Sequence, residues 1–356
     1  MIARDDLQAA VGAGMITEAQ AAGLAALADS RRGARRDLAP GDEPFELFKG
    51  FNEIFIVIGL IILAVGWSGV LGYIFGGQIT NPAQFAMTYG ALSTAVIWGL
   101  SEYFVRKRRM VAPAIALSVL FAINAAFALV AIFAQPFMVA QQDYSSLPLP
   151  FAIGTFALLV YWFRFRVPFA MAMIAVGLFI VAILMAATSQ GTPQNPSDLF
   201  LLSAGGPFAW ITLLIGLAVF GAAMWFDMSD PHRVTRRSAN GFWLHVVAAP
   251  ALVNTLALTL LESNANTALF LVMMLFALVA IIIDRRSFLI AAIGYIVVLS
   301  STVFEGDSAA ATIVILGIIL LTLGAFWERI RAMILRPLAG ILPLHKLPPS
   351  NIPSKD

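Results

Sequence analysis

The amino-acid sequence predicts an all-α polytopic membrane protein with about ten transmembrane helices, both termini in the cytoplasm, and a small N-terminal cytoplasmic helical hairpin. Hydrophobic residues make up 60 % of the chain and charged residues only 12 %, whereas soluble domains carry about 25 % charge. The apolar residues form runs long enough to cross a bilayer, and the basic residues gather in alternate loops between those runs. Lipid is therefore the expected solvent of most of the chain.

Residues 1–36 are expected to form a cytoplasmic hairpin of two short helices. Thr17 and Gln20 fit a capping box at the start of the second helix, and Ile16 precedes them as a hydrophobic staple. One face of that helix carries four apolar residues, Ala21, Leu24, Leu27 and Ala28. A hairpin of this size cannot hold a core alone. It should therefore dock on a protein partner, on the membrane or on the protein's own loops, and a polar linker follows over 37–48.

The transmembrane domain is expected over residues 49–335. Its apolar runs approach the length that a spanning helix needs, about 20 residues. The predicted spans are 52–77, 82–104, 111–134, 149–163, 167–188, 205–226, 241–262, 267–283, 287–304 and 309–327. The proline-rich tail 336–356 is expected to lie along the inner membrane interface.

The distribution of Lys and Arg predicts the orientation of the chain. All 22 lie in the N-terminal segment, the C-terminal segment or the loops after the second, fourth, sixth and eighth predicted spans. The loops on the other side contain none. Cytoplasmic loops are the ones enriched in basic residues, so both termini are expected inside. Adding or removing one span would break this alternation.

Two stretches of the chain align with each other. Residues 156–166 match 276–286 at a constant offset, and the helices before them align more loosely. The alignment predicts two four-helix repeats, 82–188 and 205–304. The alternative is that apolar helices with basic ends resemble one another without being repeats.

Polar residues within the apolar runs are the first candidates for a site. Asn124 and Asn254 fall near the middle of their predicted helices, where a buried amide either bonds helix to helix or contacts a solute. His245 is either a functional ionisable group or a neutral histidine bonded to a loop. Pro250 predicts a kink, at which freed backbone carbonyls could line a cavity.

Charged residues at the predicted inner ends of the helices form a second candidate set. Glu102 precedes Arg106 by one helical turn, the favourable order for an ion pair. The rest of this inner-face charge cluster consists of Asp227, Asp230, Arg236 and Arg237. All of them are interpreted first as charges that anchor loops. No carboxylate is predicted in mid-membrane, which disfavours a proton relay.

The positions of the glycines and the scarcity of Cys and His limit the kinds of site that the chain can form. Five glycines fall in the outer half of the first span: Gly66, Gly69, Gly72, Gly76 and Gly77. They predict close helix packing, with a pore or substrate lining as the alternative. The chain has no Cys and three His, and it contains no phosphate-binding or metal-ligand motif. We therefore expect no catalytic, cofactor-binding or metal-binding residues.

Three strings resemble a group of proteobacterial multi-pass membrane proteins of unknown function. They are Asp230 to Ser238 followed by Phe242 to His245, then Asp284 to Arg286, then Leu342 to Pro349. This resemblance implies a bacterial inner membrane and no particular activity. Helix number and orientation are also similar to those of drug/metabolite transporters. That family has two inverted halves, whereas the repeat here is parallel.

The sequence leaves three functions open. The first is a transporter or permease for a small solute. The second is a non-catalytic membrane subunit or assembly factor of a larger complex, which would bind its protein partner through residues 1–36. The third is an intramembrane enzyme that would need His245. The expected surroundings are the lipid bilayer and anionic lipids at the inner face, and no nucleic acid is expected.

Overall fold

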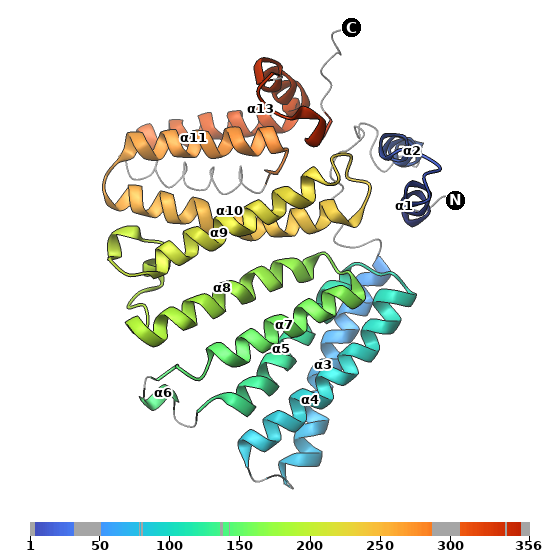
Figure 1. The fold of residues 1–356 in the computed structure, drawn as a ribbon, viewed down its shortest axis with the longest axis vertical. Coiled ribbons are helices and arrows are strands. Elements are labelled where there is room, and N and C mark those ends of the chain that lie inside the picture. Colours follow the sequence, from blue (N-terminus) through green and yellow to red (C-terminus); the bar gives the residue numbers. More distant parts are fainter. Residues whose placement is uncertain are drawn as a thin grey trace. The chain divides into compact units, whose positions relative to one another are not determined.

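The protein is seen in a computed structural model that describes residues 4–31, 51–77, 79, 81–135, 138–141, 143–286, 307–338 and 340–349 (Figure 1). All regular elements in these ranges are helices. Seven of the described helices are long and apolar enough to cross a membrane: α3, α5, α7, α8, α9, α10 and α11. The chain is therefore a multi-pass membrane protein in contact with lipid. The predicted ninth span, 287–304, and the linker 37–48 lie outside the described residues.

The chain divides into two compact units. Unit 1 comprises residues 1–43 and 197–356, and unit 2 comprises residues 44–196. The border falls between the stretches predicted to be repeats, but the repeat itself stays a prediction. The total of ten spans and the side of the membrane on which the termini lie also stay predictions.

Unit 2 is a bundle of helices joined by short turns. Its elements are α3 (Phe51–Gly76), α4 (Pro82–Ser101), η1 (Glu102–Lys107), α5 (Ala112–Phe133), α6 (Met138–Gln141), α7 (Pro148–Phe165) and α8 (Phe169–Gln190). The predicted second span, 82–104, is not a uniform α-helix, because its last residues belong to the π-helix η1. Prolines in the first turn of α4, α5 and α7 suit positions whose N–H has no partner in the helix.

Unit 1 contains the N-terminal hairpin and the later helices. Its elements are α1 (Arg4–Gly12), α2 (Glu18–Arg31), η3 (Leu202–Ala204), α9 (Phe208–Met228), α10 (Arg236–Glu262), α11 (Asn266–Ile283), α13 (Asp307–Leu338) and η4 (Leu344–Lys346), while η2 (Pro196–Leu199) lies at the border of the units. The predicted capping box is confirmed. The Thr17 N–H donates to Gln20 Oε1 (2.9 Å), and the Gln20 N–H donates to Thr17 Oγ1 (3.2 Å).

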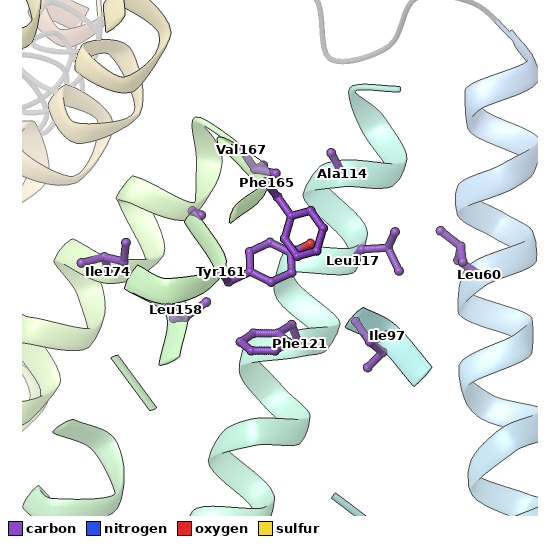
Figure 2. Packing of buried hydrophobic residues seen from close by; sticks show 11 residues of the cluster. Leu60, Ile97, Ala114, Leu117, Phe121, Leu158, Tyr161, Phe165, Val167 and Ile174 are labelled. Carbon is purple, nitrogen blue, oxygen red and sulfur yellow. The ribbon is translucent and has the colours of Figure 1, made fainter. Parts of the chain in front are cut away.

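An aromatic cluster holds unit 2 together where α4 ends and α7 ends. The ring of Tyr161 lies 4.7 Å from that of Phe121 and 4.5 Å from that of Phe165, measured between centroids. Figure 2 shows these three rings side by side among buried aliphatic side chains. Trp98 packs edge-on against Phe165 at 5.0 Å, and the Tyr161 hydroxyl shares a hydrogen bond with Ser101 (2.9 Å). The buried hydroxyl thus has a partner, as apolar surroundings require.

A carboxylate from one helix caps the start of another in unit 2. Glu53, buried on α3, accepts hydrogen bonds from the backbone N–H groups of Val111 (3.2 Å) and Ala112 (3.0 Å) at the start of α5. These N–H groups have no partner within their own helix. The negative charge also suits the positive end of the helix dipole. This contact ties α3 to α5.

Close helix packing occurs at glycines other than those predicted. A Cβ built on Gly90 of α4 would lie 2.6 Å from the Cβ and 2.9 Å from the Cα of Ala128 on α5. In contrast, no described atom lies within 4 Å of a Cβ built on Gly66, Gly69, Gly72, Gly76 or Gly77. Among the described residues, the predicted close packing is therefore not seen at these five glycines, although Leu71 of the same half of α3 is buried. Sequence spacing identified a row of small residues but not the helix face that is covered.

Candidate functional site

Ionisable side chains meet inside unit 1 at the end where α9 finishes and α10 begins. The end of α11 and the second half of α13 contribute to the same region. Six charged or ionisable residues there are buried: Asp227, Asp230, His245, Asp284, Arg285 and Arg331. Buried charges of this density require partners, because burying an unpaired charge is costly.

The centre of the site is the carboxylate of Asp227 in the last turn of α9. Arg285 donates to it twice, from Nη2 to Oδ1 (2.6 Å) and from Nε to Oδ2 (2.9 Å). His245 Nε2, from α10, lies 2.9 Å from the same Oδ2. This bidentate geometry makes the strongest kind of ion pair in proteins. We call Asp227, His245 and Arg285 the Asp227 triad.

Small and aromatic neighbours allow the Asp227 triad to form. A Cβ on Gly241 of α10 would overlap Oδ1 of Asp227, so glycine is required for the carboxylate to reach its partners. The ring of Phe220 on α9 packs edge-on against the His245 imidazole, with 5.5 Å between the ring centroids. Arg285 also donates from Nη2 to the Ser238 carbonyl (3.0 Å). The triad therefore links α9, α10 and the residues after α11.

A second ion pair lies next to the Asp227 triad in sequence. Asp284 ends α11 in the left-handed conformation (φ 56°), which aspartate tolerates better than most residues. Arg233 donates from Nη1 to the Asp284 carboxylate (3.0 Å) and from Nη2 to its carbonyl (2.7 Å). Trp327 of α13 donates from its indole N–H to the same carboxylate (2.6 Å). This pair joins the α9–α10 turn to α11 and α13.

Arg331 connects α13 to the C-terminal tail through backbone carbonyls. Its guanidinium donates to Ile281 (3.2 Å) at the end of α11 and to Pro348 (2.7 Å) and Pro349 (3.1 Å) in the tail. The side chain is completely buried. Burial lowers the pKa of Arg331, and the charges of Asp284 and Glu328 oppose that effect. Burial likewise lowers the pKa of Arg285, to about 9.

The α9–α10 turn is built on Asp230. Its carboxylate accepts hydrogen bonds from the N–H groups of Val234 (3.1 Å) and Thr235 (2.8 Å) and from the Thr235 hydroxyl (2.7 Å). The carbonyl of Val234 then accepts a bond from the Gln8 side chain of α1 (3.0 Å). The N-terminal hairpin therefore touches a loop of its own chain, which is one of the three docking modes expected from the sequence.

The structure separates the predicted inner-face charge cluster. Asp227 and Asp230 are buried in unit 1, whereas Arg236 and Arg237 are exposed at the start of α10. Asp230 anchors its loop as expected. Asp227 pairs with His245 of α10 and with Arg285 in the turn after α11, so the loop that it holds is not its own. The predicted ion pair of Glu102 with Arg106 is present in unit 2 (3.0 Å), and Arg164 adds a second contact to Glu102 (2.7 Å).

The remaining predicted site residues lie outside the ionic region. Asn124 is buried on α5, and its amide N–H donates to the Leu120 carbonyl of the same helix (2.8 Å). Asn254 is half-buried on α10. Pro250 is exposed and lies inside α10, while the neighbouring Ala248 and Ala249 are fully buried. Of the predicted solute-path residues, His245 alone is shown in contact with an ionised side chain.

Sequence reasoning did not identify Arg285, Asp284, Trp327 or Arg331 as site residues. The first two were assigned to a basic inner loop because they follow an apolar run. Arg331 shares a helical face with Trp327 and Leu335, all three buried, and this spacing was the one signal that could have placed it inside.

The Asp227 triad is a buried ion pair with a histidine beside it. It combines a carboxylate, an imidazole and a guanidinium, and each is shielded from water. Within the described residues, no group of three or more His, Cys, Asp or Glu side chains could hold a metal ion.

No protein-family model, curated protein or solved structure matches the chain. The resemblances noted in the sequence therefore stay predictions.

Proposed function

We propose that the chain is an inner-membrane permease for a small solute, with both termini in the cytoplasm. The observation that supports this proposal is the Asp227 triad. Ionisable groups inside membrane helix bundles usually belong to solute or proton pathways. Stability alone does not account for them, because well-packed apolar residues often stabilise a core as much as a buried ion pair does.

The division of the chain into two compact units also favours transport. Alternating access in many transporters moves one helix bundle against another. Such motion requires bundles that stay internally rigid. In unit 1 the Asp227 triad and the bonds of Arg233 and Arg331 tie α9, α10, α11 and α13 together. In unit 2 the aromatic cluster and Glu53 do the same for α3, α5 and α7.

Within this proposal each member of the triad has a distinct task. Asp227 holds Arg285 in place through two hydrogen bonds, and His245 shares the second carboxylate oxygen. Because His245 and Arg285 contact the same carboxylate oxygen, replacing His245 changes the surroundings of the ion pair directly. We expect the triad to control the predicted inner end of the pathway. This makes His245 the residue whose replacement tests the function.

The test begins with native mass spectrometry of the protein purified gently from membranes. A permease should appear without a protein partner and carry a small bound mass that identifies the solute class. Uptake of that compound into proteoliposomes is then measured for the parent protein and for His245→Gln. Loss of one hydrogen bond to a charged group, about 1.5 kcal/mol, should slow uptake roughly tenfold.

The matched control for this test is Glu102→Gln, which alters a solvent-exposed ion pair in unit 2. It should leave both uptake and the melting temperature unchanged, whereas the melting temperature of His245→Gln should fall by no more than a few degrees. Parent-like uptake by His245→Gln would contradict the proposal.

A non-catalytic membrane subunit is the second candidate, and the N-terminal hairpin favours it. Three apolar side chains of the hairpin are exposed: Met15 (78 %), Leu24 (44 %) and Leu27 (56 %). The two leucines belong to the apolar face that the sequence predicts to dock, so these two side chains are free to contact a partner. Deleting residues 1–36 should remove a bound protein partner. The melting temperature of the remaining chain is measured alongside, because Gln8 of the hairpin donates a hydrogen bond to Val234 in the α9–α10 turn. Native mass spectrometry of both forms measures the partner, and a partner retained after deletion would contradict this candidate.

A further inference from the structure

The second half of α13 has two faces of different chemistry. The helix dihedral angles break at Phe326 (φ −118°, ψ 22°), so residues 327–338 form a separate segment after a kink. One face of this segment is buried and consists of Trp327, Arg331, Ala332 and Leu335. The other face is exposed. The question is which molecules contact this exposed face in the membrane.

Apolar and basic residues alternate along the exposed face. Phe326 (47 % exposed), Arg329, Met333 (69 % exposed) and Arg336 follow each other at steps of three, four and three residues, the spacing of one helical face. The Arg329 guanidinium lies over the Phe326 ring, 5.8 Å from its centroid. A face with aromatic and aliphatic groups beside arginines is typical of helices that lie in a membrane interface.

The buried face fixes which way the segment points. Trp327 donates to Asp284, and Arg331 donates to carbonyls of α11 and of the tail. Rotating the helix would break these buried hydrogen bonds, so Phe326 and Met333 cannot be buried against the rest of unit 1. Their exposure is therefore a fixed property of unit 1.

The segment continues an apolar row on the first half of α13. Val314, Ile318 and Leu321 are exposed there at steps of four and three residues, within the stretch that the sequence predicts to be the last span. A row of exposed apolar side chains that reaches a kink and then gains arginines is expected where a helix passes from the hydrocarbon region to the headgroups. Headgroup phosphates have the charge that two guanidinium groups attract.

We propose that residues 327–336, which follow the kink at Phe326, form an interfacial helix that binds anionic phospholipid headgroups through Arg329 and Arg336. Phe326 and Met333 enter the upper acyl-chain region. The proposal is independent of the transported solute, because it requires only that the chain lies in a membrane. It assigns the binding of anionic lipid to one defined helical face, where the sequence had predicted anionic lipid along the whole inner face.

The absence of cysteine in the chain makes the test direct. A single Met333→Cys variant of the full protein is labelled with an environment-sensitive fluorophore. The protein is reconstituted in phosphatidylcholine with or without phosphatidylglycerol, with brominated lipid as a quencher from the bilayer and iodide as a quencher from water. Met15→Cys, exposed in the α1–α2 hairpin, gives the signal of a label in water.

With phosphatidylglycerol present, the label at position 333 should be quenched by brominated lipid and protected from iodide. Adding Arg329→Gln or Arg336→Gln should reduce the preference for brominated phosphatidylglycerol over brominated phosphatidylcholine about fivefold each. The control Arg236→Gln/Arg237→Gln removes two charges from exposed residues of unit 1, as many as the two test changes remove together, and it should leave the preference unchanged.

Two results would overturn the proposal. The first is equal access of iodide to labels at positions 333 and 15 in both lipid mixtures. The second is a label at position 333 that is shielded equally with and without phosphatidylglycerol and does not respond to either arginine change. That result would indicate a protein surface over this face instead of lipid headgroups.

Discussion

Replacing Asp227 with alanine should lower the free energy of unfolding by about 3–5 kcal/mol, because Arg285 would remain buried without its carboxylate. Arg285 has a side-chain exposure of 1 %, so water cannot substitute for the missing partner. The same change also removes the carboxylate from His245. Equilibrium unfolding of the detergent-solubilised protein in increasing sodium dodecyl sulfate measures the effect.

A double replacement separates the ion pair from general damage to the core. Asp227→Leu with Arg285→Met removes both charges together, and it should be less destabilising than Asp227→Ala, because no uncompensated charge remains. The control is Glu102→Ala, which disrupts contacts to Arg106 and Arg164 in unit 2. These groups are partly exposed, so water and salt screen them and the free energy of unfolding should hardly change. Equal losses from Asp227→Ala and Glu102→Ala would contradict the prediction.

Gly90→Ala should destabilise unit 2 by about 1–3 kcal/mol, the usual cost of an added methyl group in a tightly packed interior. The new Cβ would lie 2.9 Å from backbone atoms of Ala128, so α4 and α5 must separate. The same unfolding measurement reports the loss.

Gly69→Ala is the matched control, since no described atom lies near the added methyl group. There the higher helix propensity of alanine should stabilise the protein by up to about 1 kcal/mol. If Gly69→Ala proved as harmful as Gly90→Ala, the outer half of α3 would pack against a partner that the described residues do not include.

Local features of this protein follow from the sequence alone. Apolar runs located the helices, so that the predicted spans 52–77 and 111–134 differ by one residue at each end from α3 and α5. The capping box of Thr17 and the ion pair of Glu102 with Arg106 were also predicted. Each of these features involves residues within four positions of each other or within one run. Backbone hydrogen bonding and helical spacing therefore determine them before any helices meet.

Only the tertiary structure decided which residues form the site. Asp227 and Arg285 are 58 positions apart, and no periodicity links them. The same holds for Glu53 and its partners at the start of α5. In water, the faces of a helix differ because one of them must avoid solvent. In a membrane, the lipid and the protein interior are both apolar, so hydrophobic pattern does not mark the face that packs inward. The packed faces, and with them the partners of each buried charge, depend on close fit between distant helices.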